Sequence, residues 1–203
     1  MLVDKKLEKF LDELASSSPA PGGGSVSALL GALSSALTSM VCRLTENKKG
    51  YENFRGEIKK VLAESESIRK RVTKLIDEDT NVFNEVMSAL KMPKEDPERH
   101  KRIQDGMKRA TEVPLKIMRE CYKALELARV VAEKGNVNSV SDAGIAALTA
   151  NTGVLAASLN AMINLKFIKD SGFIEKTADE VTDWTKKSSE LNKEIMRIVT
   201  QKI

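Results

Sequence analysis

Residues 21–42 read PGGGSVSALLGALSSALTSMVC and contain no charged residue. Small residues recur along it at helical spacing: Ala28, Gly31, Ala32, Ser35, Ala36 and Ser39. Small side chains let another backbone approach closely, and a helix without charges has no face suited to water. We therefore expect a buried helix from about residue 25 to residue 45, with Ser25 as its N-cap.

A second uncharged stretch, AGIAALTANTGVLAASLNAMINL, covers residues 143–165. Both stretches are long enough to span a membrane. However, they are rich in Gly, Ser, Thr, Asn and Ala and lack a continuous body of large aliphatic residues. We expect both to be helices enclosed by protein, with no membrane partner. Because a chain of 203 residues rarely encloses two such helices alone, this pattern also indicates an oligomer.

Elsewhere, apolar residues recur every three or four positions, which is typical of amphipathic helices. The helices are expected at about residues 4–15, 51–90, 97–133, 142–165 and 175–203. No segment shows the alternation of a strand. The sequence therefore predicts one all-α domain over residues 1–203, a multihelical bundle with long amphipathic helices. Pro114 lies inside the fourth helix, where it removes a backbone donor, frees the carbonyl of Ala110 and is expected to cause a kink.

Composition excludes several classes of protein. The net charge is +4 and the two signs are interspersed, so we expect no nucleic-acid partner. The two cysteines, Cys42 and Cys121, lie in apolar helical settings and indicate reduced core thiols rather than a disulfide framework. His100 is the only histidine and has no Cys or His partner nearby, so no metal site is expected. The charged N-terminus does not resemble a signal peptide, and we expect a cytoplasmic protein.

The first candidate site is the turn at Pro21, Gly22, Gly23, Gly24 and Ser25, before the buried helix. Glycines let consecutive N–H groups point into one space, and a helix start adds partial positive charge. Such a turn suits an anion or the polar edge of a ring. The alternative is a tight turn that only brings the helix close to its neighbours.

The second candidate is Asp79, with Thr80 beside it. Asp79 falls on the apolar seam of the third helix, between Leu75 and Val82. A carboxylate there is costly unless it is paired or hydrogen-bonded. It could be an acid–base group with a shifted pKa, or a structural carboxylate that bonds a lysine, an arginine or a helix end.

The third candidate is the connector GNVNSVSD, residues 135–142. Ser141 or Asp142 as an N-cap would explain one of its polar side chains. Asn136 and Asn138 are not explained in that way, and amide groups are suited to the donor and acceptor edge of a heterocycle.

Taken together, these motifs resemble the formiminotetrahydrofolate cyclodeaminase family, which includes the cyclodeaminase domain of formiminotransferase-cyclodeaminase. The resemblance rests on five segments in the family's order: residues 19–29, 79–87, 110–115, 135–144 and 159–165. Many relatives carry Ala immediately before Phe83, where this chain has Val82. No formiminotransferase domain is expected within these 203 residues.

The resemblance implies an interlocked homodimer with active sites near the dimer interface. It implies conversion of 5-formiminotetrahydrofolate to 5,10-methenyltetrahydrofolate and ammonia, on a tetrahydrofolate derivative in mono- or polyglutamylated form. Methenyltetrahydrofolate cyclohydrolase is a sister activity, and a non-catalytic folate-binding or helical module is a further alternative. No cofactor beyond the folate substrate and no metal is expected.

Proton transfer and positioning suffice for cyclodeamination. We expect Asp79 to shuttle the proton, with Asp142 as a second carboxylate. The turn at residues 22–25 would bind a pterin edge or a glutamate carboxylate, and Asn136 and Asn138 would hydrogen-bond the heterocycle. The prediction requires these groups to share one cavity.

Overall fold

The computed structural model describes residues 1–203, and its regular structure is entirely helical. The six α-helices are α1 (Leu7–Leu14), α2 (Gly23–Glu46), α3 (Arg55–Leu90), α4 (Arg99–Lys134), α5 (Val140–Leu165) and α6 (Ser171–Lys202). Short 3-10 turns cover Leu2–Asp4, Glu52–Phe54 and Val137–Ser139. The all-α multihelical fold that the sequence predicts is confirmed.

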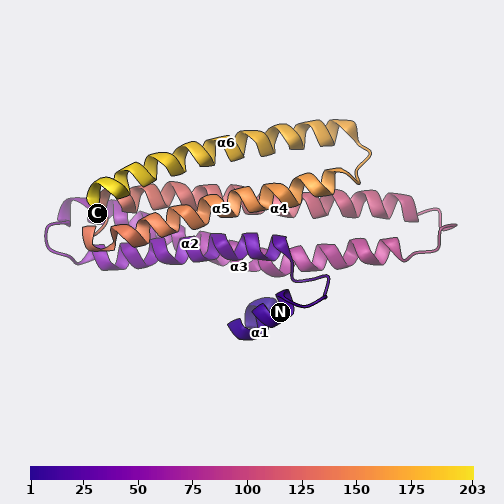
Figure 1. Cartoon of the computed structure of the whole chain (residues 1–203), viewed down its shortest axis with the longest axis horizontal. Coiled ribbons are helices and arrows are strands. Elements are labelled where there is room, and N and C mark those ends of the chain that lie inside the picture. Colours follow the sequence, from indigo (N-terminus) through magenta and orange to yellow (C-terminus); the bar gives the residue numbers. More distant parts are fainter.

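Helices α2 to α5 form an elongated bundle, as Figure 1 shows. Helix α6 lies along this bundle and packs against α5 and α4, whereas α1 is set apart from it. The C-terminus lies at the end of the bundle where α5 begins, and Lys202 Nζ donates there to the carbonyl of Ala132 at 2.7 Å.

Helices α2 and α5, which contain the two uncharged stretches, pack closely against α4 where they carry glycine instead of a larger residue. A Cβ added to Gly31 of α2 or to Gly153 of α5 would lie 2.7 Å from Cys121 Sγ of α4. The main hydrophobic cluster contains 32 buried residues, nearly all of them aliphatic, alanine or cysteine. A core with few aromatic side chains therefore lets the helices pack closely.

One detail differs from the sequence-based expectations. Helix α2 begins at Gly23 with Gly22 as its N-cap, so Ser25 is not the N-cap but a buried residue of the first turn. Ser25 uses its hydroxyl on α3 instead, as described below. Helix α4 runs without interruption from Arg99 through Pro114 to Lys134, as the sequence predicts, and the kink expected at Pro114 stays a prediction.

Helix α2 is mostly buried, but α5 keeps an exposed apolar stripe. Two segments, Gly23–Glu46 and Val137–Leu165, are long and apolar enough to cross a membrane, a test that core helices of soluble proteins also pass. The stripe consists of Ile145, Leu148, Leu155, Leu159, Met162 and Ile163. In a single chain, therefore, α2 is enclosed over most of its surface although Leu33 and Leu44 remain exposed, and α5 is enclosed on one side only.

Candidate active site

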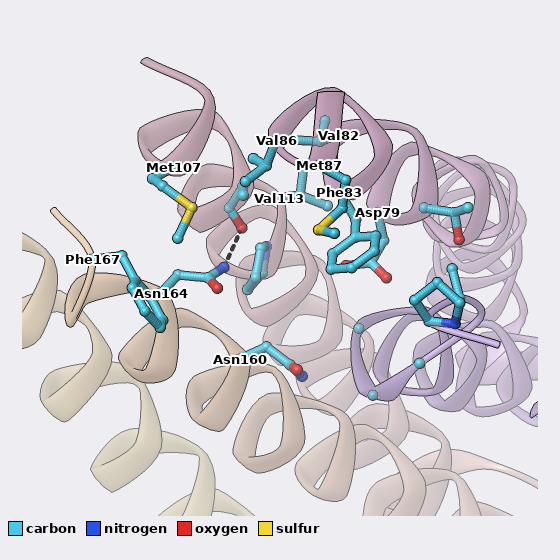
Figure 2. Close-up of a pocket in the computed structure, with 18 of the residues that line it drawn as sticks. Asp79, Val82, Phe83, Val86, Met87, Met107, Val113, Asn160, Asn164 and Phe167 are labelled. Atoms are coloured by element: carbon cyan, nitrogen blue, oxygen red, sulfur yellow. Dashed lines mark hydrogen bonds between the residues drawn. The ribbon is translucent and has the colours of Figure 1, made fainter. Parts of the chain in front are cut away.

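A cavity of about 450 Å³ opens between four helices at the end of the bundle where α2 begins. The turn before α2, the second half of α3, the first half of α4 and the end of α5 line it (Figure 2). Its apolar wall is formed chiefly by Val82, Phe83, Val86, Met87, Leu90, Ile103, Met107, Val113 and Phe167. Its volume and apolar wall are typical of a site for a small organic ligand.

Asp79 is the only ionisable side chain among the residues that line the cavity. It lies on α3 against the first turn of α2, where a Cβ added to Gly24 would be 2.0 Å from Asp79 Oδ1. Gly24 is therefore required for the carboxylate to approach this helix start. The approach also places a negative charge at the positive end of the α2 dipole.

Ser25 and Thr80 complete the surroundings of the carboxylate. Ser25 Oγ lies 3.1 Å from Asp79 Oδ2 and 3.1 Å from the carbonyl oxygen of Ile76, so one hydroxyl proton serves two acceptors. Thr80 Oγ1 lies 3.4 Å from Ser25 Oγ. No lysine or arginine forms an ion pair with Asp79. Of the three structural partners expected for this carboxylate, a lysine, an arginine or a helix end, only the helix end is present.

Burial raises the pKa of Asp79 above its ordinary value, while hydrogen bonds from the Ser25 hydroxyl and backbone N–H act in the opposite direction. Desolvation is the largest contribution, so the net shift is upward. A carboxyl group with a raised pKa, open to a cavity, is suited to accept and return protons.

Two asparagines of α5, which the site prediction did not include, face the same cavity. Asn164 Nδ2 donates to the carbonyl oxygen of Ala110 at 2.8 Å, the bond drawn as a dashed line in Figure 2. This is the carbonyl that Pro114 leaves without its helical partner. One turn earlier, Asn160 Nδ2 donates to the carbonyl oxygen of Ala156 at 3.0 Å. The sequence did contain a signal for these two residues. The carbonyl that Pro114 frees needs a donor, and α5 carries two asparagines one helical turn apart.

The connector does not reach this cavity within one chain. Asn136 Oδ1 accepts from Lys48 Nζ at 2.6 Å and from the backbone N–H of Asn138 at 3.1 Å. The backbone N–H of Asn136 donates to Thr45 Oγ1 at 2.8 Å. Asn136 therefore ties the end of α2 to the start of α5, whereas the side chain of Asn138 is exposed.

Asp142 and Ser141 lie at the same far end of the bundle. At 1.5 Å per residue, α5 separates Asp142 from Asn160 by about 27 Å. The prediction that Asn136, Asn138, Ser141 and Asp142 share a cavity with Asp79 is wrong for a single chain. The physical reason is the direction of α5. This helix begins at the connector and reaches the glycine turn only near its other end.

The predicted residues that the structure does bring together are Gly22, Gly23, Gly24, Ser25, Asp79 and Thr80. Pro21 is buried beside them but does not line the cavity. The two thiols lie elsewhere in the core, and burial raises the pKa of both Cys42 and Cys121 to about 12. Such thiols are poor nucleophiles. The arrangement is thus suited to proton transfer by one carboxyl group rather than to nucleophilic catalysis by cysteine.

Comparison with known proteins identifies the family. The sequence model for formiminotransferase-cyclodeaminase matches residues 6–183, which include every residue that lines the cavity. The chain belongs to the formiminotransferase-cyclodeaminase family. The resemblance inferred from the sequence motifs is therefore confirmed.

Members of this family that resemble the chain carry two different reaction names. A methenyltetrahydrofolate cyclohydrolase from Methylorubrum extorquens is 42% identical over 207 residues and is covered, like this chain, over its full length. The formimidoyltransferase-cyclodeaminase of Rattus norvegicus is 34% identical over 89% of this chain, which spans only 34% of that protein. The crystal structure of a formiminotetrahydrofolate cyclodeaminase from Thermotoga maritima superposes with a TM-score of 0.92 at 28% identity, covering 99% of this chain and 98% of the other. The chain is thus a folate one-carbon enzyme whose relatives include cyclohydrolases and cyclodeaminases.

Proposed function

We propose that the chain hydrolyses 5,10-methenyltetrahydrofolate to 10-formyltetrahydrofolate, with Asp79 as the group that transfers the proton. The observation that carries the proposal is the position of Asp79, the one ionisable side chain in a largely apolar, ligand-sized cavity. The full-length similarity to a cyclohydrolase at 42% identity favours this reaction over its sister.

In the proposed reaction, water adds to the methenyl carbon between N5 and N10, and Asp79 accepts one of its protons. A tetrahedral carbon results, which bears a hydroxyl group and both nitrogens. The bond from this carbon to N5 then breaks, Asp79 returns its proton to N5, and the hydroxyl proton leaves as the formyl group forms. One proton is released for each substrate cation, so atoms and charge balance. General acid–base catalysis of this kind contributes about 10²–10⁴-fold.

Cyclodeamination of 5-formiminotetrahydrofolate is the second candidate, and the close superposition on the Thermotoga maritima cyclodeaminase favours it. Here N10 would attack the formimino carbon, its proton would pass to Asp79, and the leaving nitrogen would take up a proton and depart as ammonia. Both reactions pass through a tetrahedral carbon between N5 and N10, and both use one proton-transferring group.

Two assays with the purified protein separate the candidates. Loss of the methenyl absorbance, faster than the uncatalysed loss and faster than with Asp79→Asn protein, would support the cyclohydrolase. Ammonia release from 5-formiminotetrahydrofolate without that hydrolysis would instead assign cyclodeamination. If the folded protein shows neither activity, both candidate functions are contradicted.

We further propose that the chain is a homodimer that buries the apolar stripe of α5. In a single chain, Leu159 is 72% exposed and Ile145 is 48% exposed, although α5 has no charged residue beyond Asp142. The stripe extends along most of the helix, and a second copy offers a matching uncharged surface.

A further inference from the structure

Both asparagines in the cavity have their amide groups fixed in the same way. The Nδ2 atom of Asn164 is held by the carbonyl of Ala110, and that of Asn160 is held by the carbonyl of Ala156 and lies 3.5 Å from Ser27 Oγ. An amide whose nitrogen donates to a protein carbonyl must turn its oxygen the other way. No hydrogen bond within the chain uses either Oδ1 atom.

Asn164 is the more tightly constrained of the two. Its partner carbonyl belongs to a different helix, α4, and Pro114 ensures that no helical N–H competes for that carbonyl. Figure 2 shows Asn164 on the opposite side of the cavity from Asp79, with Asn160 between them. The cavity thus has a proton-transferring group at one side and oriented acceptors at the other.

We propose that Asn164 is a specificity-determining residue whose Oδ1 accepts a hydrogen bond from the 2-amino group of the pterin ring. The proposal rests on the proposed folate function, because it assigns one end of that ligand. The reacting N5 and the 2-amino group lie at opposite ends of the pterin, just as Asp79 and Asn164 lie at opposite sides of the cavity. The Pro114–Ala110 pair acts as the positioning element, since it keeps the amide from rotating.

The ligand side of this contact can be tested by removing the donor. Tetrahydrofolate and its 2-desamino-2-methyl analogue are compared by calorimetry on the wild type and on an Asn164→Leu variant. The wild type should bind the analogue roughly tenfold more weakly, as expected for one lost hydrogen bond. Asn164→Leu should bind both compounds equally. Asn151→Leu on the same helix, away from the cavity, serves as the matched control and should discriminate like the wild type.

A Pro114→Ala/Asn164→Leu double variant keeps the test independent of folding. The alanine introduced in place of Pro114 supplies the helical N–H that satisfies the Ala110 carbonyl, so the loss of Asn164 leaves no unpaired backbone group. The double variant should be at least as stable as Asn164→Leu and should still fail to distinguish the two ligands. In turnover, its KM should rise while kcat changes little, because Asp79 and its surroundings are untouched.

The outcomes separate this inference from the proposed function. If the wild type binds tetrahydrofolate but both Asn164 variants still discriminate against the analogue, the contact with Asn164 is disproved and the folate function stands. If the wild type binds both ligands equally, the 2-amino group is not recognised and the inference also fails. If no folate binds to the folded wild type, the proposed function fails and the inference fails with it.

Discussion

Gly24 and Asp79 lie so close that no side chain fits between them: a Cβ on Gly24 would be 2.0 Å from Asp79 Oδ1 and 2.4 Å from its carboxyl carbon. The backbone of α2 therefore forms one wall of the space that holds the carboxylate. This contact explains why the first turn of a buried helix carries glycine, which is otherwise unfavourable in a helix. The role proposed for Asp79 in proton transfer depends on this position.

Gly24→Ala should consequently impair catalysis more than folding. The added methyl group must displace the carboxylate, and a displacement of about 1 Å can cost about 10²-fold in rate. We expect kcat to fall by about that factor in a protein with a wild-type circular dichroism spectrum. Gly56→Ala is the control, because a Cβ there meets nothing within 4 Å. Equal activity of the two variants would show that Gly24 does not position Asp79.

Asp79→Asn should make the protein more stable at neutral pH. Burial raises the pKa of Asp79 in the folded state, so its protonated form adds stability that is complete below the unfolded pKa, about 3.9, and is lost as the pH rises through the folded pKa. As the pH rises toward 7 the wild type loses this contribution, whereas asparagine does not ionise and its contribution does not change with pH. The Tm of the variant should exceed that of the wild type at pH 7, and the difference should shrink toward pH 4. A lower Tm at pH 7 would mean that the carboxylate stabilises the fold.

Gly153→Ala should destabilise the core by about 1–3 kcal/mol through overpacking. The new methyl group would lie 2.7 Å from Cys121 Sγ and 3.3 Å from the carbonyl oxygen of Ser27. Adding Cys121→Ala removes the sulfur atom and should recover part of that loss. Urea unfolding of the two single variants and the double variant measures this coupling, and purely additive effects would contradict the proposed contact.

Ile145→Lys should weaken the proposed homodimer, because it places a charge on the exposed apolar stripe of α5. Sedimentation velocity should show a dimer for the wild type and a monomer, or a concentration-dependent mixture, for the variant. Thr200→Lys on the exposed side of α6 adds the same charge elsewhere and should remain dimeric. A wild-type monomer at micromolar concentration would disprove the dimer.

Much of the fold could be predicted from the sequence because its signals are local. The apolar repeat of the third helix predicted an end at residue 90, where α3 ends. Pro114 predicted a carbonyl in need of a donor, and Asn164 supplies that donor. Asp79 could be identified as a candidate because a carboxylate on the apolar face of a helix is costly unless it is paired or hydrogen-bonded. That face of α3 contacts both the core and the cavity.

The remainder of the site depends on which ends of antiparallel helices meet, and no local signal contains that information. The connector at residues 135–142 has suitable chemistry, yet α5 leads away from it, so the asparagines at the other end of the same helix line the cavity instead. Asn136 is occupied by Lys48 and Thr45, which are distant in sequence. The polar side chain of Asn136 therefore serves to connect the end of α2 to the start of α5.

Single-turnover kinetics of the Asp79→Asn variant decide whether Asp79 transfers the proton. With bound 5,10-methenyltetrahydrofolate, the rate of methenyl loss should fall by about 10²–10⁴-fold, while the affinity for tetrahydrofolate stays within a few-fold of the wild type. If the wild type turns over 5-formiminotetrahydrofolate instead, the same comparison is made with that substrate. A folded Asp79→Asn protein that reacts at the wild-type rate would show that Asp79 does not transfer the proton.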